Sequence, residues 1–163
     1  MANNNNIKLT ALRDIINKAK DCKKFLKENI LTDIIRQNKA VFENEGNNLY
    51  GDGSRWIPNS PRWTAFKEKN VGQIARAYGQ NFMVKNANVM RLTDRMYKAL
   101  TRNSPSQDVE HVITNNKLSY ISKVEYQPFL ESGYGKVPPR EVLFAGKNQV
   151  KQWANMLQKY LMP

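Results

Sequence analysis

Apolar residues recur at spacings of three and four through the first third of the chain. Leu12, Ile16, Ile30 and Ile34 are members of this series, and most of the lysines fall between them on the opposite face. This periodicity is typical of an amphipathic helix. The pattern predicts one long helix or two stacked helices, broken near Asn29 or Thr32, in a region that ends at about residues 45–46.

The period changes to two further along the chain. Apolar and polar residues alternate over Val109–Ile113 and again over Leu118–Val124, and an Asn-Asn-Lys turn joins the two runs. This combination predicts a β-hairpin. Helical spacing returns after Gly146. The sequence therefore predicts an α+β fold with an N-terminal helical region, a small antiparallel sheet with a hairpin, and a C-terminal helix packed on the sheet.

Shorter elements are expected between these main ones. Pro61, with Ser60 before it, indicates a helix over residues 61–69, because proline is favoured at the first position of a helix. Residues 89–100 also show helical spacing. Residues 126–132 form a turn or short helix that stops at a glycine, and residues 141–144 are a candidate strand.

The length of 163 residues suits one domain of ordinary size. We expect a single domain over 1–163, helical over 1–45 and α+β over 46–163. No window approaches about 18 consecutive apolar residues, and the Asn-rich N-terminus does not read as a signal peptide. These features predict no membrane partner. Cys22 is the only cysteine, so the default expectation is a reducing compartment.

The formal net charge is +12, which implies an anionic partner. Between residues 55 and 102 there are ten lysines and arginines against two acidic residues. This stretch is the best candidate for a basic face toward an acidic partner or DNA. Its candidate residues are Arg55, Arg62, Lys67, Lys69, Arg91, Arg95, Lys98 and Arg102.

Candidate catalytic chemistry is sparse. His111 is the only histidine, so a zinc site of ordinary type lacks ligands, and we expect no metal and no cofactor. A Ser-His-Asp arrangement would have to use this histidine in mid-strand, where a paired strand histidine is the simpler interpretation. Two carboxylate pairs, Glu43 with Glu45 and Asp108 with Glu110, lie in polar stretches that are expected to be solvated, so they do not indicate general acid catalysis. The sequence predicts that the protein is not an enzyme.

A stiff Val-Pro-Pro segment precedes Arg140. Proline fixes its own φ and favours extended geometry in the residue before it, so this arginine is expected on a pre-ordered backbone. Such an arginine suits a carboxylate or carbonyl at a subunit or domain boundary, and a satisfied surface arginine is the alternative. Aromatic residues in rigid loops are core or interface anchors. The candidates for a subunit or neighbour interface are Trp56, Pro58, Trp63, Tyr126, Pro138 and Arg140.

Several motifs occur in an order that resembles a known family. The landmarks are a helix ending at Phe42 before an acidic residue and glycine, Asp-Gly-Ser-Arg-Trp-Ile-Pro-Asn-Ser at 52–60, Leu-Thr-Asp-Arg-Met-Tyr-Lys-Ala-Leu-Thr at 92–101, a Tyr-to-Gly turn at 126–133, and Val-Pro-Pro-Arg at 137–140. Their order and spacing, from about residue 31 to the C-terminus, resemble the phage virion morphogenesis family. That family includes tail-completion proteins of contractile-tailed phages.

The resemblance implies a structural virion protein of the neck or tail, assembled in the host cytoplasm. It implies a ring, expected to be a homohexamer, that acts as a tail-completion or tail-terminator protein, caps the tail tube and takes part in head–tail joining. Expected neighbours are the tail tube, the sheath and neck or connector proteins, with non-specific contact to DNA in transit. The alternative from the residues alone is a small basic protein that binds nucleic acid non-specifically and is weakened by salt.

Overall fold

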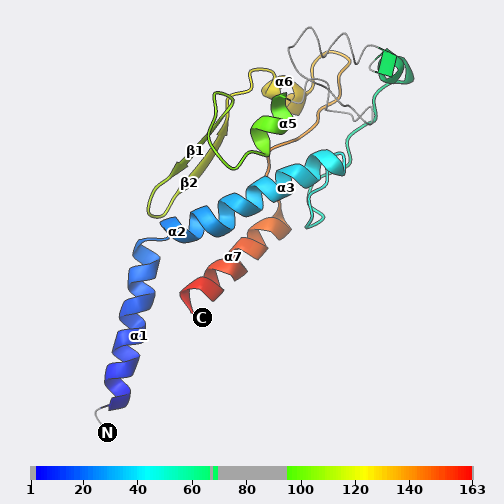
Figure 1. Cartoon of the computed structure of the whole chain (residues 1–163). Helices are drawn as coiled ribbons and strands as arrows, with labels where there is room; N and C mark the ends of the chain where they lie inside the picture. The colour runs from blue at the N-terminus through cyan, green and yellow to red at the C-terminus, as the bar shows by residue number, and fades with distance from the viewer. Residues whose placement is uncertain (1–2, 67, 70–94, 163) are drawn as a thin grey trace.

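The computed structural model describes residues 3–66, 68–69 and 95–162. Figure 1 shows a long helical N-terminal part, a hairpin on one side of it and a C-terminal helix on the other. The described elements are α1 (Asn3–Lys20), α2 (Lys23–Phe25), η1 (Leu26–Leu31), α3 (Thr32–Glu43), α5 (Arg95–Leu100), β1 (Val109–Ile113), β2 (Leu118–Ser122), α6 (Gln127–Ser132) and α7 (Lys147–Leu161). The predicted α+β class is confirmed.

The N-terminal helical region is divided in two, but at a different place from the one predicted. α1 ends at Lys20, and helical structure then runs without a break from residue 23 to 43, through the π-helical turns of η1. A π-helix brings residues five apart onto one side. It therefore allows Phe25 and Ile30 to be buried together, so the chain needs no break at Asn29 or Thr32.

The predicted hairpin is confirmed. β1 and β2 pair antiparallel with a register from Val109 opposite Ser122 to Ile113 opposite Leu118. The Thr114 amide donates to the Lys117 carbonyl at 2.8 Å and closes the turn. The second strand ends two residues earlier than the alternating pattern suggested.

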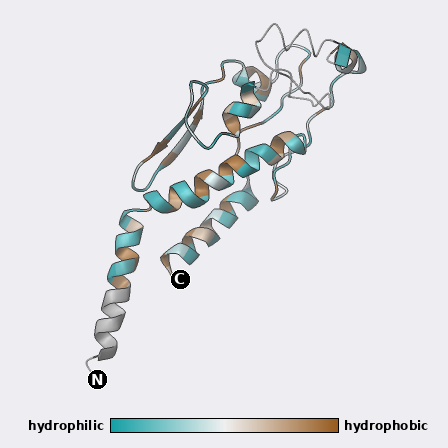
Figure 2. Ribbon diagram, viewed as in Figure 1, coloured by the Kyte–Doolittle hydropathy of each residue, from teal (hydrophilic) through white to brown (hydrophobic). Residues whose placement is uncertain are grey.

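The core lies where α3, α5, the start of β1 and the loop around Trp56 meet. The ring of Phe42 packs edge-on against Trp56 at 5.8 Å and against Tyr97 at 5.4 Å between centroids. Hydrophobic and hydrophilic residues recur in turn along α3 in Figure 2, as expected for a helix with one buried face. The buried members of the core are Val41, Phe42, Trp56, Met96, Ala99, Leu100, Val109, Val124 and Val142.

α7 runs beside α3 rather than on the sheet as predicted (Figure 1). The indole of Trp153 donates to the carboxylate of Asp33 at 2.7 Å, and Tyr160 contacts the ring of Phe25 with centroids 5.1 Å apart. These contacts hold α7 alongside the continuous helix formed by α2, η1 and α3. The predicted start of this helix just after Gly146 is confirmed.

Residues 141–144 do not form the predicted strand. The Arg140 amide donates to the Leu130 carbonyl, and the Leu143 amide donates to the Glu131 carboxylate, both on α6. The hydrogen bonds that a strand partner would satisfy therefore go to a helix. α6 itself confirms the predicted short helix, which ends at Gly133 with a φ of 76°. Residues 61–66 are helical as predicted, and residues 70–94 lie outside the described part.

Candidate functional site

The Val-Pro-Pro segment delivers Arg140 to a carbonyl, but that carbonyl belongs to the same chain. The guanidinium donates to the Ile57 carbonyl at 3.1 Å and to Asn59 Oδ1 at 3.4 Å, and the residue is only 6% exposed. Burial lowers the pKa of Arg140, and the negative charge of Glu45 partly offsets this. Arg140 therefore fastens the loop at residues 57–59 onto the segment that follows α6.

Trp56 has the same kind of role. It is 4% exposed, and its indole nitrogen donates to the Glu141 carbonyl at 3.0 Å. Trp56 and Arg140 were predicted to lie on a subunit interface. Each is enclosed by its own chain and presents little surface to a neighbour, so a contact at this place would use mainly the side chains around them.

The side chains around these two anchors point outward. Phe129 and Tyr134 are 57% and 73% exposed and pack edge-on, with ring centroids 6.0 Å apart. Backbone hydrogen bonds of 3.1 and 2.9 Å pair Tyr134 with Val137. We call the exposed and half-buried apolar residues of α6 and its two neighbouring loops the α6 platform: Ile57, Pro58, Phe129, Tyr134, Val137 and Pro138.

The remaining predicted interface residues differ in exposure. Trp63 is exposed and stacks on Phe66, with centroids 5.1 Å apart and planes at 11°. Tyr126 is half-buried against the core. Trp63 thus remains a candidate contact residue, as do the platform residues Pro58 and Pro138. Tyr126 mainly supports the fold.

Part of the predicted basic face lines a depression of about 500 Å³ beside α5. We call it the α5 depression. Its lining residues are Arg95, Lys98, Ala99, Arg102, Ser106, Gln107 and Asp108. Arg55, Arg62 and Lys69 are exposed elsewhere, and Lys67 and Arg91 lie outside the described residues.

One cation of the α5 depression is fixed in place. The Arg95 guanidinium donates through Nε and Nη2 to one carboxylate oxygen of Asp108, at 3.1 and 2.7 Å. This hydrogen bonding holds the pKa of Arg95 above its ordinary value, against a smaller effect of burial. The Asp108 amide in turn donates to the hydroxyl of Ser106 at 3.3 Å. The depression therefore has an ordered floor and an excess of positive charge.

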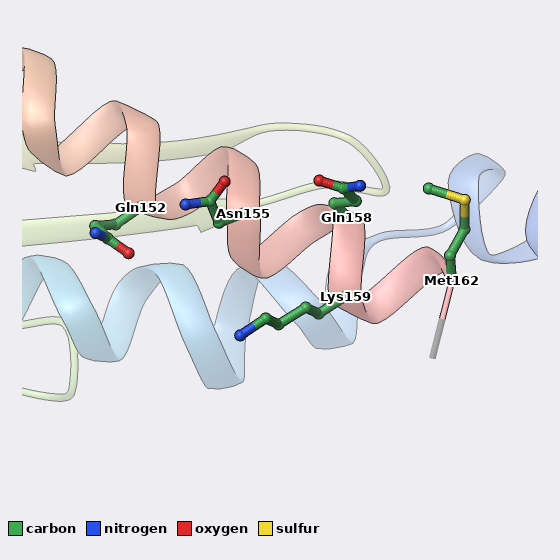
Figure 3. Close-up of a pocket in the computed structure, with 5 residues that line it drawn as sticks. All are labelled: Gln152, Asn155, Gln158, Lys159 and Met162. Carbon is green, nitrogen blue, oxygen red and sulfur yellow. The ribbon is translucent and has the colours of Figure 1, made fainter.

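A second depression, of about 460 Å³, lies on α7. It is lined by Gln152, Asn155, Gln158, Lys159 and Met162, and in Figure 3 Lys159 points away from Asn155 and Gln158. Its described lining has one cation, and that side chain does not point toward the amide side chains. This depression is therefore a weaker candidate for a binding site than the α5 depression.

A buried carboxylate on α3 escaped the sequence analysis. Asp33 accepts hydrogen bonds from Trp153, Gln37, Tyr50 and Arg36 at 2.6–3.0 Å. Burial alone would raise the pKa of Asp33, but these four hydrogen bonds outweigh burial and lower it. The acid falls on the same face of the helix as its buried apolar residues, which is the signal that could have revealed it.

Asp52 is a second carboxylate that the sequence did not reveal. Its two oxygens accept the backbone amides of Asn148 and Gln149 at 3.0 and 2.8 Å, in the first turn of α7. Slight burial raises the pKa of Asp52, but these bonds and one involving Asn48 lower it overall. Asp52 therefore caps a helix nearly a hundred residues away along the chain.

Within residues 3–66, 68–69 and 95–162, no three His, Cys, Asp or Glu side chains are grouped so that they could hold a metal ion. In the same ranges, no helix is both long enough and apolar enough to cross a membrane. No protein-family model, curated protein or solved structure matches this chain. The residues and their geometry are therefore the basis for a functional assignment.

Proposed function

We propose that this protein is a structural subunit of a phage neck or tail. In this proposal it forms a ring as a tail-completion or tail-terminator protein, caps the tail tube and takes part in head–tail joining. The observation that carries the proposal is the α6 platform, an exposed apolar surface held from beneath by buried Trp56 and Arg140.

A rigid apolar surface of this kind favours a protein–protein contact. Contiguous exposed apolar side chains mark interaction sites, and anchors that are ordered before binding lose little conformational entropy in the complex. Five of the six platform residues lie in the segments 52–60, 126–133 and 137–140, which are three of the landmarks that resemble the virion morphogenesis family, and Tyr134 directly follows the second of them. The exposed apolar residues and the segments that carry the resemblance thus largely coincide.

A ring of identical subunits needs two different surfaces on each copy. α1 supplies a candidate for the second, because it stands away from the hairpin and α3 in Figure 1. Its exposed Leu12 and Ile16 lie one helical turn apart. We propose the α6 platform and α1 as the contact surfaces toward copies of the chain and toward neighbouring tail or neck proteins.

Sedimentation of the purified protein at micromolar concentration tests this proposal. The wild-type protein is expected to sediment as a closed ring, and the double substitution Phe129→Ser with Tyr134→Ser is expected to shift it to the monomer. Both side chains are exposed, so the fold should survive.

The matched control is Val150→Ser with Met162→Ser, which removes two exposed apolar side chains from α7 and the residue that ends it, outside the α6 platform. This control is expected to retain the ring. A wild-type protein that is strictly monomeric and absent from phage particles would contradict the proposal.

A second candidate function is non-specific nucleic-acid binding. The α5 depression favours it, because three of its described lining residues are cations and one is acidic. Binding of this kind depends on phosphate charge and falls steeply as salt rises.

A further inference from the structure

We propose that the α5 depression binds a phosphate group of a nucleic-acid backbone. The depression would make the DNA contact expected above. Only the choice of DNA as the source of the phosphate rests on the proposed functions. The depression is formed by α5 on one side and by the turn at residues 102–108 on the other.

The charge of the depression suits an anion. Arg95 and Asp108 neutralise each other as an ion pair with a shortest distance of 2.7 Å, and the exposed Arg102 adds a positive charge to the lining. The ion pair also fixes the Arg95 guanidinium, so part of the site is ordered before a ligand arrives. Charge-assisted hydrogen bonds from arginine to phosphate oxygens are among the stronger polar contacts in proteins.

Arg102 is not needed to cap α5. A cation just beyond a helix often binds the last carbonyl groups, but here the Leu100 carbonyl already accepts the Tyr120 hydroxyl at 2.8 Å and the Asn38 amide at 3.0 Å. Among the residues that the structure describes, Arg102 is exposed and makes no hydrogen bond or ion pair. Its guanidinium is therefore available to a ligand.

Neutral donors complete the site. The Ser106 hydroxyl accepts the Asp108 amide, which leaves its own proton to donate, and Gln107 presents an exposed amide. Backbone hydrogen bonds hold the turn in place. Ser106 and Val109 exchange two of them, at 2.9 and 3.3 Å, and the backbone amide of Lys123 donates to the Asp108 carbonyl at 2.8 Å. Donors from several directions suit a tetrahedral phosphate better than a planar carboxylate.

The lining also indicates which part of a nucleic acid is bound. None of the seven described lining residues is aromatic, so a base finds no ring on which to stack. Contacts to phosphate alone position a protein on a duplex and carry no sequence information. The expected ligand is therefore the backbone of DNA of any sequence.

Fluorescence anisotropy with a short labelled duplex, at about 50 mM salt, tests the site. Arg102→Gln is expected to weaken binding about tenfold and to reduce the slope of log affinity against log salt by about one. Lys151→Gln on α7 is the matched control, since it removes one positive charge from an exposed position outside the depression, and it is expected to change affinity less than about twofold. Equal effects of the two variants, or no binding by the wild-type protein, would overturn the proposal.

Amide chemical shifts of Ser106, Gln107 and Asp108 identify the source of the anion. Shifts with the duplex support the nucleic-acid backbone, and the same shifts with inorganic phosphate alone support a site for free phosphate. Larger shifts with polyglutamate than with either would overturn the proposal in favour of an acidic protein. Sedimentation of Arg102→Gln separates the hypotheses, because loss of DNA binding with an intact ring leaves the assembly proposal standing.

Discussion

His111 stacks on Tyr120 across the hairpin, with ring centroids 4.7 Å apart. Both of its ring nitrogens are buried without a hydrogen-bond partner, and burial lowers the pKa of His111. The neighbouring Tyr120 hydroxyl is bound to the end of α5, and burial raises the pKa of Tyr120 to about 12, so it stays neutral. At the scale of single residues, the only described histidine therefore contributes by packing. Protonation of its ring would destabilise the folded state.

Stability should therefore fall as the pH drops. The unfolded chain takes up a proton near the ordinary histidine pKa of about 6.5, before the folded chain does. The stabilisation is present above that pH and is lost as the pH falls toward the lower pKa of the folded state. Urea unfolding of wild type and His111→Phe between about pH 7 and about pH 5.5 measures this, and the variant should show the smaller loss. Parallel losses in both proteins would refute the role of His111.

At the scale of elements, α7 is fixed by polar contacts from distant segments. Asp52 caps its N-terminus, and Asp33 binds its Trp153 indole from α3. Gly146 permits the first of these contacts, because a Cβ there would lie within 2.5 Å of three atoms of the Asp52 side chain. The helix therefore depends on the loop that follows α3 for its position.

Asp52→Ala should lower the free energy of unfolding by about 1 kcal/mol, the usual cost of losing an N-terminal helix cap. The reason is that the amides of Asn148 and Gln149 lose their acceptor. Urea denaturation gives the value. Asp14→Ala is the control, as Asp14 is exposed on α1, and it should change stability by less than about 0.5 kcal/mol.

Elements with local signals were predictable from the sequence. The hairpin, the stop of α6 at Gly133 and the start of α7 depend on alternation and turn residues that lie next to each other in the chain. The uninterrupted helix at residues 29–32 and the absence of a strand at 141–144 were not predictable. They depend on burial of Phe25 with Ile30 and on hydrogen bonds to α6, which no local pattern specifies.

The same distinction applies to the candidate site. The sequence predicted that Arg140 would find a carbonyl, because the prolines before it are a local signal. It did not predict that the carbonyl would be that of Ile57, 83 residues away in the same chain. Likewise, the basic composition predicted a cationic face, and only the fold gathered Arg95, Lys98 and Arg102 into one depression.

At the scale of the whole molecule, Arg140 joins the loop at residues 57–59 to α6, and both segments carry exposed apolar side chains. Its guanidinium binds the 57–59 loop, and its backbone amide binds α6. Although the guanidinium Nε is buried without a partner, the other bonds hold Phe129 and Tyr134 on an ordered base. Assembly should therefore depend on Arg140 indirectly.

Arg140→Ala should lower the free energy of unfolding by about 1–3 kcal/mol, because the carbonyl of Ile57 and the side chain of Asn59 lose a charged hydrogen-bond donor. The variant should remain folded and assemble more weakly than wild type. Urea denaturation and sedimentation at matched concentrations measure the two effects. Arg62→Ala is the control for loss of an exposed arginine. Undiminished assembly by Arg140→Ala would show that contacts do not require the ordered loops.

The joint between α1 and α2 has a mechanical consequence. The Cys22 amide donates to the Asn115 carbonyl at 2.7 Å, so the joint is tied to the tip of the hairpin. Lys18 also reaches the Tyr160 carbonyl at 3.4 Å, near the end of α7. The position of α1 therefore depends on the tip of the hairpin and on the end of α7, two parts of the fold that are far from α1 in the sequence.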